Sequence, residues 1–207
     1  MNERAAVSTA ALSAFSGNRR GVGLMERARA FSRGFTLIEL LIVVAIIGII
    51  AAIAIPSLLR ARVSANEAQV IGDTRTVMSA SVTYATANCG FFANDLTCLT
   101  REGGGSICIP NYPTGGPQFL GADIARASPY TKSGYSRSYL PGLQAPTVDA
   151  SKCDPNSLLE YCYMSVPAQL GLSGVRSFSC SSAGTIYANG TGAAIPCPIP
   201  PGTDILQ

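Results

Sequence analysis

The longest apolar run in the chain lies near its N-terminus. Sixteen consecutive residues, 40–55, carry no charged or strongly polar side chain, and the apolar stretch around them covers the 25 residues 35–59. As an α-helix with a rise of 1.5 Å per residue, this stretch is roughly 37 Å long, enough to cross a hydrocarbon layer of about 30 Å. The pattern therefore predicts a membrane-spanning helix.

The charges on either side of this run indicate its orientation. Arg27, Arg29 and Arg33 precede the run closely, and Arg60 and Arg62 follow it. Because the side with more basic residues stays in the cytoplasm, we expect the N-terminus to be cytoplasmic and the rest of the chain to lie outside.

A second helical pattern follows without a break. Apolar residues recur every seven positions over 60–88, with further apolar residues beside them on the same face: Val63, Val70, Val77 and Tyr84, with Ile71, Met78 and Ala85. This period is typical of an amphipathic helix, and Glu67, Thr74 and Ser81 interrupt its apolar face. We expect one helix over 35–87, of which the second half packs on its own domain. Pro56 is expected to kink it, and Gly48 is a second weak point.

The composition changes at residue 89. Residues 89–207 hold all seven Cys, 12 of 13 Pro and 15 of 21 Gly, which is typical of a loop-rich domain. We expect 89–133 to be an irregular connection and 195–207 to be extended and peripheral. Four stretches are strand-like: 134–140, 159–166, 175–180 and 185–188. The last two flank a predicted hairpin turn at 181–184. An antiparallel sheet packed on the amphipathic helix gives an α+β fold of ladle shape.

Composition and charge narrow the classes of function. Only 13% of residues are charged, and the net charge of +3 comes from residues 1–34, which hold six Arg and two Glu. The remainder has no basic excess, so no nucleic-acid partner is evident. The chain has no His, which excludes Ser-His-Asp and Cys-His catalysis and His-ligated zinc. We expect no enzyme activity, no metal and no cofactor.

The cysteines are typical of an oxidising compartment. No Cys-x-x-Cys pair occurs, which argues against metal binding and favours disulfides in the 89–207 domain. From spacing alone we expect the pairs Cys153–Cys162 and Cys180–Cys197, with Cys89 joined to either Cys98 or Cys108. Because seven is an odd number, at least one thiol is free or bridges two subunits.

Glu39 does not fit a plain membrane anchor, because an ionised carboxylate in hydrocarbon costs a few kcal/mol. The sequence Arg33-Gly34-Phe35-Thr36-Leu37-Ile38-Glu39, followed by apolar residues to Pro56, closely resembles the N-terminal signature of type IV pilins and pseudopilins. The resemblance is dense over 33–59, weaker over 60–87 and only general beyond.

The resemblance implies a set of roles for these residues. A prepilin peptidase would cut between Gly34 and Phe35, and the new amine of Phe35 would be methylated. The carboxylate of Glu39 would pair with the amine of a neighbouring copy and set the register of a helical homopolymer, because an unpaired buried charge typically costs ~3–5 kcal/mol. Gly48 and Pro56 match positions between which the family is thought to lose helix in the filament.

Other interpretations of the N-terminus stay open at this point. A conventional secretory signal has a shorter apolar core and no Glu within it. An unprocessed single-span anchor is also possible. The leader is expected to be residues 1–34, and a start at Met25 would shorten it to ten residues.

Three functions compete. The first is a structural subunit of a type IV pilus, inserted in the inner membrane with its head in the periplasm and then assembled by an inner-membrane platform into a surface filament. The second is a pseudopilin or minor pilin of a type II secretion or DNA-uptake machine. The third is a monomeric membrane-anchored binding protein.

Overall fold

The computed structural model describes residues 34–102 and 106–206, so the expected leader 1–34 lies outside the described residues except for Gly34. The chain divides into two compact units, residues 1–44 and residues 45–207. The first described element is the helix α1 (Leu37–Ala87), of 51 residues. It begins two residues later than the predicted helix and ends at the predicted residue. Gly48 and Pro56 both lie inside α1 and neither ends it; the kink expected at Pro56 stays a prediction.

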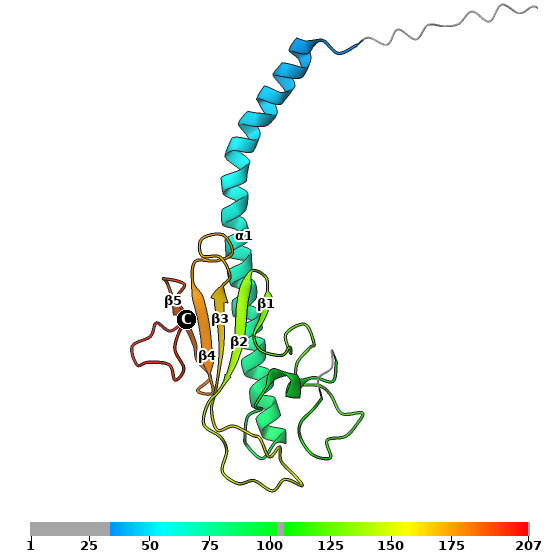
Figure 1. Ribbon diagram of the computed structural model, residues 1–207, viewed down its shortest axis with the longest axis vertical. Helices are drawn as coiled ribbons and strands as arrows, with labels where there is room; N and C mark the ends of the chain where they lie inside the picture. The colour runs from blue at the N-terminus through cyan, green and yellow to red at the C-terminus, as the bar shows by residue number, and fades with distance from the viewer. Residues whose placement is uncertain (1–33, 103–105, 207) are drawn as a thin grey trace, which may run out of the picture. The chain divides into compact units, whose positions relative to one another are not determined.

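Five antiparallel strands form one sheet in chain order, as Figure 1 shows. They are β1 (Tyr130–Lys132), β2 (Tyr135–Pro141), β3 (Tyr161–Pro167), β4 (Ser177–Ser181) and β5 (Ile186–Asn189). The four longer strands match the predicted ones to within one or two residues, and the turn between β4 and β5 lies at the expected hairpin. The predicted irregular connection 89–133 was wrong at two places, because it holds β1 and the short 3-10 helix η1 (Leu96–Leu99).

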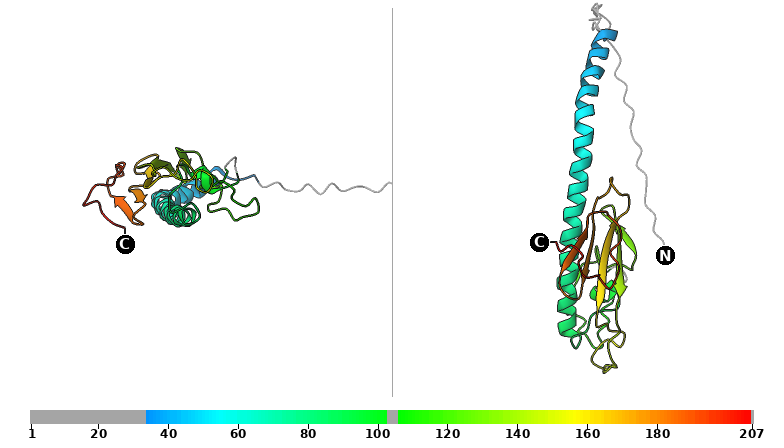
Figure 2. Two further views of the ribbon diagram at one scale, coloured as in Figure 1. Left: turned by 90° about the horizontal axis from the view of Figure 1, so that it is seen from below. Right: turned by 90° about the vertical axis from the view of Figure 1, so that its left-hand side faces the viewer.

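The C-terminal half of α1 covers one face of the sheet, as Figures 1 and 2 show together. Val70, Val77 and Tyr84 are fully buried, whereas Val63, one heptad earlier, is only half-buried. Their sheet-side neighbours include Tyr163 and Phe178. Burial of an apolar side chain of this size stabilises the fold by about 1.5–3 kcal/mol. The face of α1 that carries these heptad positions, called the heptad stripe below, therefore holds the helix and the sheet together.

The three polar residues in the heptad stripe are buried as well. Thr74 donates a hydrogen bond from Oγ1 to the carbonyl of Val70 in the preceding turn, at 2.8 Å. Glu67 accepts hydrogen bonds from the sheet side, and Ser81 Oγ has no hydrogen-bond partner among the described residues. A polar residue on the apolar face is therefore accommodated chiefly where a partner is within reach.

The disulfides correct the predicted pairing, which is wrong in every pair. The bonds are Cys89–Cys153, Cys98–Cys108 and Cys162–Cys197, and the thiol of Cys180 is free. The register explains the error at β3 and β4. Cys180 pairs with Tyr163, so the neighbouring Cys162 points to the opposite face of the sheet. Cys180 lies in the core beneath α1, while Cys162 meets Cys197 on the outer face.

The C-terminal segment is extended but not wholly peripheral, in contrast to the prediction. Ile195 is buried, and Cys197 ties the segment to β3. Ile205 forms an isolated antiparallel bridge with Tyr187, and the amide of Leu206 donates to the carbonyl of Ile186. The segment therefore covers the edge of the sheet at β5, which leaves less of that edge free to pair with other chains.

Candidate functional site

The predicted processing and assembly residues lie together at the start of α1. Gly34 and Phe35 precede the helix in non-regular backbone, and the side chain of Phe35 is 84% exposed. Glu39 lies in the first turn of α1. The bond between Gly34 and Phe35 is therefore outside regular secondary structure, which suits a peptide bond that a protease must reach.

Thr36 and Glu39 form a reciprocal cap at the N-terminus of α1. Oε2 of Glu39 accepts hydrogen bonds from the amide and from Oγ1 of Thr36, at 2.9 and 2.6 Å. The amide of Glu39 in turn donates to Oγ1 of Thr36 at 3.2 Å. This capping box satisfies backbone donors that a helix start leaves free, and it holds the carboxylate beside the residue that follows Phe35.

This cap was not among the predicted features, although its signal is present in the sequence. The pattern Thr36-x-x-Glu39 directly before an apolar run is the known signature of a capping box. The hydrogen bonds that the carboxylate of Glu39 accepts come from neutral groups of Thr36. Within residues 34–102 and 106–206, no salt bridge includes Glu39.

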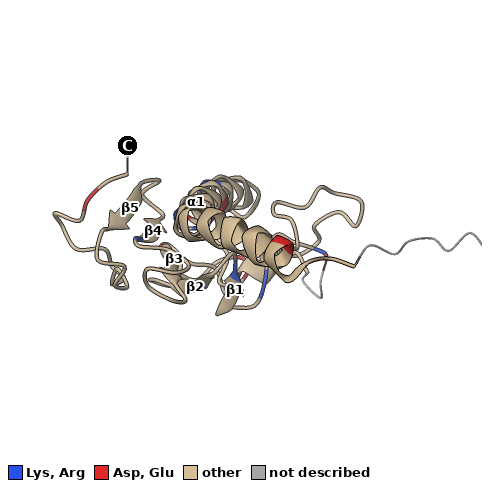
Figure 3. Cartoon of the chain, turned by 90° about the horizontal axis from the view of Figure 1, so that it is seen from above, with Lys and Arg blue, Asp and Glu red and all other residues tan. Residues whose placement is uncertain are grey.

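The surface of α1 between residues 35 and 59 is apolar and exposed. Every large apolar side chain in this range is at least 44% exposed. The most apolar segment of α1 has a mean hydropathy of 3.1, and none of its residues is buried. α1 is therefore long and apolar enough to cross a membrane. Figure 3 shows this part of α1 almost entirely in the colour of uncharged residues. Such an area is far larger than soluble monomers expose, which marks it as a contact surface for lipid or protein.

Glu67 fastens α1 to the loop between β3 and β4. Its Oε1 accepts the amides of Val175 and Arg176, at 3.0 and 3.1 Å. Its Oε2 accepts Nε and Nη2 of Arg176, at 3.0 and 2.7 Å. Burial alone would raise the pKa of Glu67, but these donors, led by the amide of Val175, hold it below its ordinary value. The carboxylate is therefore a structural anchor for the loop.

A second set of charges lies between α1 and the strands β1 and β2 at the other edge of the sheet. Arg137 on β2 is completely buried and donates from Nη1 to Oδ2 of Asp73 at 2.5 Å. Lys132 lies 3.2 Å from the same oxygen and 2.8 Å from Oδ2 of Asp123. The hydrogen bond from Lys132 lowers the pKa of Asp123. These paired charges connect α1, β1 and β2.

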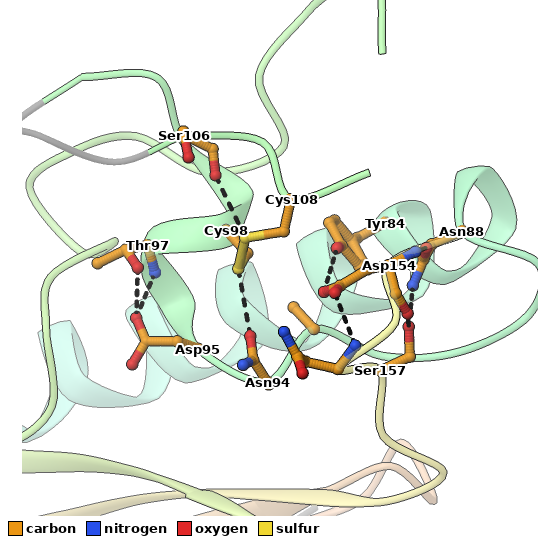
Figure 4. The surroundings of a disulfide bond; sticks show 12 residues. Tyr84, Asn88, Asn94, Asp95, Thr97, Cys98, Ser106, Cys108, Asp154 and Ser157 are labelled. Atoms are coloured by element: carbon orange, nitrogen blue, oxygen red, sulfur yellow. Dashed lines mark hydrogen bonds between the residues drawn. A yellow bond between two sulfur atoms is a disulfide. The ribbon is translucent and has the colours of Figure 1, made fainter. Parts of the chain in front are cut away.

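The C-terminal end of α1 is held by a buried polar network beside a disulfide (Figure 4). Tyr84 donates to Oδ2 of Asp154 at 3.3 Å, and Asn88 accepts the amide of Asp154 at 2.7 Å and donates to Oγ of Ser157 at 2.8 Å. Burial, followed by the charge of Asp154, raises the pKa of Tyr84 well above its ordinary value.

The sulfurs of Cys98 and Cys108 and the carboxylate of Asp154 lie within 4.8 Å of one another. Such a group can hold a metal ion only if its sulfurs are thiolates. In this structure the two sulfurs form a disulfide, so they offer no thiolate ligand. The free thiol of Cys180 is buried in the core, and burial raises its pKa to about 12, which keeps it protonated.

Comparison with known proteins bears on the N-terminal part of the chain. Residues 29–55 match the family model described as the prokaryotic N-terminal methylation motif. Over 69 residues the chain is 41% identical to the type IV wide pilus major component PilA4 of Thermus thermophilus. Over 81 residues it is 39% identical to the type IV major pilin protein PilA of Myxococcus xanthus.

The N-terminal part of the chain resembles that of type IV pilins. The matched motif covers the start of α1 and most of its apolar part, which include Gly34, Phe35 and Glu39.

The likeness to these pilins is partial. The matched segments cover 33% and 38% of this chain, and they span about half of PilA4 and 37% of PilA. Both relatives are major pilins by name and no catalytic family is matched. The methylation motif thus covers the start of α1 and its apolar residues up to 55, whereas the role of the whole chain is a separate question.

Proposed function

We propose that this chain is a structural subunit of a type IV pilus, cleaved between Gly34 and Phe35, methylated on Phe35 and polymerised through residues 35–59. The observation that carries the proposal is the exposed apolar surface of α1 over this range, which begins with the capped carboxylate of Glu39. Removing this surface from water requires either a bilayer or other copies of the same helix. In the proposed function, the helix lies in the bilayer before assembly and against other copies of itself afterwards.

The charge of Glu39 favours a polymer over a lone anchor. In the described part of the chain the carboxylate has hydrogen bonds from Thr36 but no cationic partner. Hydrogen bonds reduce the cost of burying a carboxylate, and an opposite charge reduces it further. The amine that cleavage would create on Phe35 of a neighbouring copy supplies that charge, and methylation leaves the charge in place.

The proposed partners and location follow from this sequence of events. A prepilin peptidase and an inner-membrane assembly platform act on the membrane-inserted precursor, whose domain after residue 88 lies in the periplasm. The assembled filament is at the cell surface. Disulfides suit such a destination, and the described residues hold three. The role is structural, with no catalysis and no cofactor.

A second candidate is a pseudopilin or minor pilin of a secretion or DNA-uptake machine. The start of α1 suits either, because both kinds of protein polymerise. The names of the two relatives, each a major pilus component, favour the pilus subunit.

The test separates the charge of Glu39 from its capping role. Glu39→Gln keeps an oxygen that can accept from Thr36 but removes the charge. Thr36→Ala removes the two hydrogen bonds made by Oγ1 of Thr36 but keeps the backbone amide donor and the charge of Glu39. With each variant as the sole copy in the cell, membrane insertion and sheared surface filaments are measured. We expect Glu39→Gln to insert normally and to give no filaments, while Thr36→Ala still assembles. Normal filaments from Glu39→Gln would contradict the proposed pairing.

A further inference from the structure

The loop between β3 and β4, residues 168–176, carries an exposed apolar patch on the head domain. Leu170, Leu172 and Val175 are 62, 60 and 47% exposed. The loop contains no acidic residue, and its one charged residue is Arg176. Arg176 is paired with Glu67, so the loop surface is apolar and uncharged on balance, and an exposed apolar patch of this kind is uncommon on a domain that faces only water.

Two contacts fix the position of this loop along α1. Nδ2 of Asn66 donates to the carbonyl of Ser173 at 2.9 Å, and Glu67 accepts the amides of Val175 and Arg176. Within the unit of residues 45–207, the loop lies at the end of the sheet opposite to the C-terminal end of α1, as both Figure 1 and Figure 2 show. The loop therefore lies beside α1 at the level of residues 66–67.

This level is close to the end of the membrane-spanning segment. Twenty residues of helix from Leu40 to Leu59 are about 30 Å long, which equals the hydrocarbon thickness. Asn66 is seven residues further on, roughly 10 Å along the axis. The headgroup region adds about 5–8 Å on each side of the hydrocarbon. Apolar side chains on a loop at this level are close enough to reach the headgroup region.

The charges near the loop favour a lipid surface. Arg60 and Arg62 are exposed on α1 between the apolar segment and the loop. The carboxylate of Glu67 is already neutralised by Arg176. Basic residues beside exposed leucines fit the interface of a bilayer that contains anionic lipids.

We propose that the loop 168–176 is a second membrane contact, with Leu172 and Leu170 inserted among the lipid headgroups while the subunit awaits assembly. The contact is continuous with the surface of α1 that enters the bilayer. It limits the rotation of the head relative to the membrane and gives the precursor a fixed orientation. The proposal rests on the membrane-inserted precursor of the proposed function.

The chain has no Trp, so a single introduced Trp reports one position. The full-length chain is reconstituted, at a dilution that keeps copies apart, in vesicles of phosphatidylethanolamine and phosphatidylglycerol. The lipids are brominated either near the glycerol end or near the methyl end of the acyl chain. The three variants are Leu172→Trp on the loop, Ile47→Trp in the membrane span and Leu143→Trp after β2. Leu143 is 64% exposed and lies beyond the opposite end of β2, which makes it a matched control for Leu172.

We expect the shallow bromines to quench Leu172→Trp, the deep bromines to quench Ile47→Trp more strongly, and neither to quench Leu143→Trp. Quenching of Ile47→Trp alone would overturn the lipid contact and leave the proposed function standing. Quenching of none would overturn both. Emission of Leu172→Trp that is shifted to the blue without quenching would indicate that protein, such as a second copy, covers the loop, and it too would overturn the lipid contact.

Discussion

Arg176 directs both Nε and Nη2 at one carboxylate oxygen of Glu67, while the other oxygen accepts two backbone amides of the same loop. Four donors thus converge on one side chain of α1. The carboxylate of Glu67 is almost completely buried, whereas the guanidinium of Arg176 is partly exposed. The arrangement fixes the loop 168–176 to the helix and makes Glu67 the most extensively bonded carboxylate at the junction of helix and sheet.

Glu67→Gln should destabilise the head domain, because the amide keeps at most two good acceptor positions and loses the charge. Hydrogen bonds to a charged group contribute about 1.5–3 kcal/mol, so we expect a loss near the lower end of this range for the partly exposed partner. Thermal and urea unfolding of the full chain in detergent micelles measures it. Lys152→Gln, which breaks the exposed pair with Asp149, is the matched control and should change the stability little. An equal effect of both variants would show that the anchor is unimportant.

The stability of this anchor should depend on pH in a defined direction. The pKa of Glu67 is lower in the folded chain than in the unfolded chain, where it is about 4.3. The stabilisation is therefore fully present above that value and is lost as the pH falls through the lower, folded value. The unfolding free energy of the wild type should drop in this acid range. In Glu67→Gln that part of the drop should be missing, and an unchanged pH profile in the variant would contradict the assignment.

The buried pair of Arg137 and Asp73 should respond unequally to the loss of each partner. Asp73→Ala leaves the buried guanidinium without its carboxylate, which typically costs ~3–5 kcal/mol. Arg137→Met leaves Asp73 with Lys132 at 3.2 Å and fills the space with an apolar side chain, so its cost should be smaller. The free energy of unfolding of each variant, measured under the conditions used for Glu67→Gln, gives the two losses for comparison. A larger loss for Arg137→Met would be inconsistent with this account.

The disulfides should contribute unequally to the free energy of unfolding, because they close loops of different length. Cys89–Cys153 closes 64 residues and Cys98–Cys108 closes ten, which corresponds to about 4 and about 3 kcal/mol of restricted chain entropy. Replacing both cysteines of a pair by Ala and measuring unfolding tests the order. Peptide mapping of the unreduced protein tests the pairing itself, and a peptide joining Cys180 to Cys197 would contradict it.

The N-terminal half of the fold was predictable from the sequence because its signals are local. The apolar run and the heptads of Val70, Val77 and Tyr84 determine α1 without reference to the rest of the chain. The strands β2 to β5 carry alternating or buried patterns bounded by turn residues, whereas the three residues of β1 are too few to show a pattern.

The features that the sequence did not predict depend on contacts between residues that are far apart in the chain. Spacing suggested that each cysteine pairs with a near neighbour, but the strand register turns Cys162 and Cys180 to opposite faces of the sheet. Likewise Glu67 resembled a defect in an apolar stripe, because its partner Arg176 is 109 residues away. At the candidate site the positions of Gly34, Phe35 and Glu39 followed from one motif, and the same motif contains the Thr36-x-x-Glu39 pattern of the cap, which was not predicted.

The central claim is that the chain is cut after Gly34 and works as a polymer of the remainder. Mass spectrometry of the subunit from sheared surface filaments tests it most directly, with Gly34→Val, which should stay full-length in the membrane, as the control. The account predicts a mature chain that begins at Phe35 and carries one extra methyl group on its amine. An uncut chain found only as single molecules in the membrane, or a mature chain that begins at another residue, would contradict it.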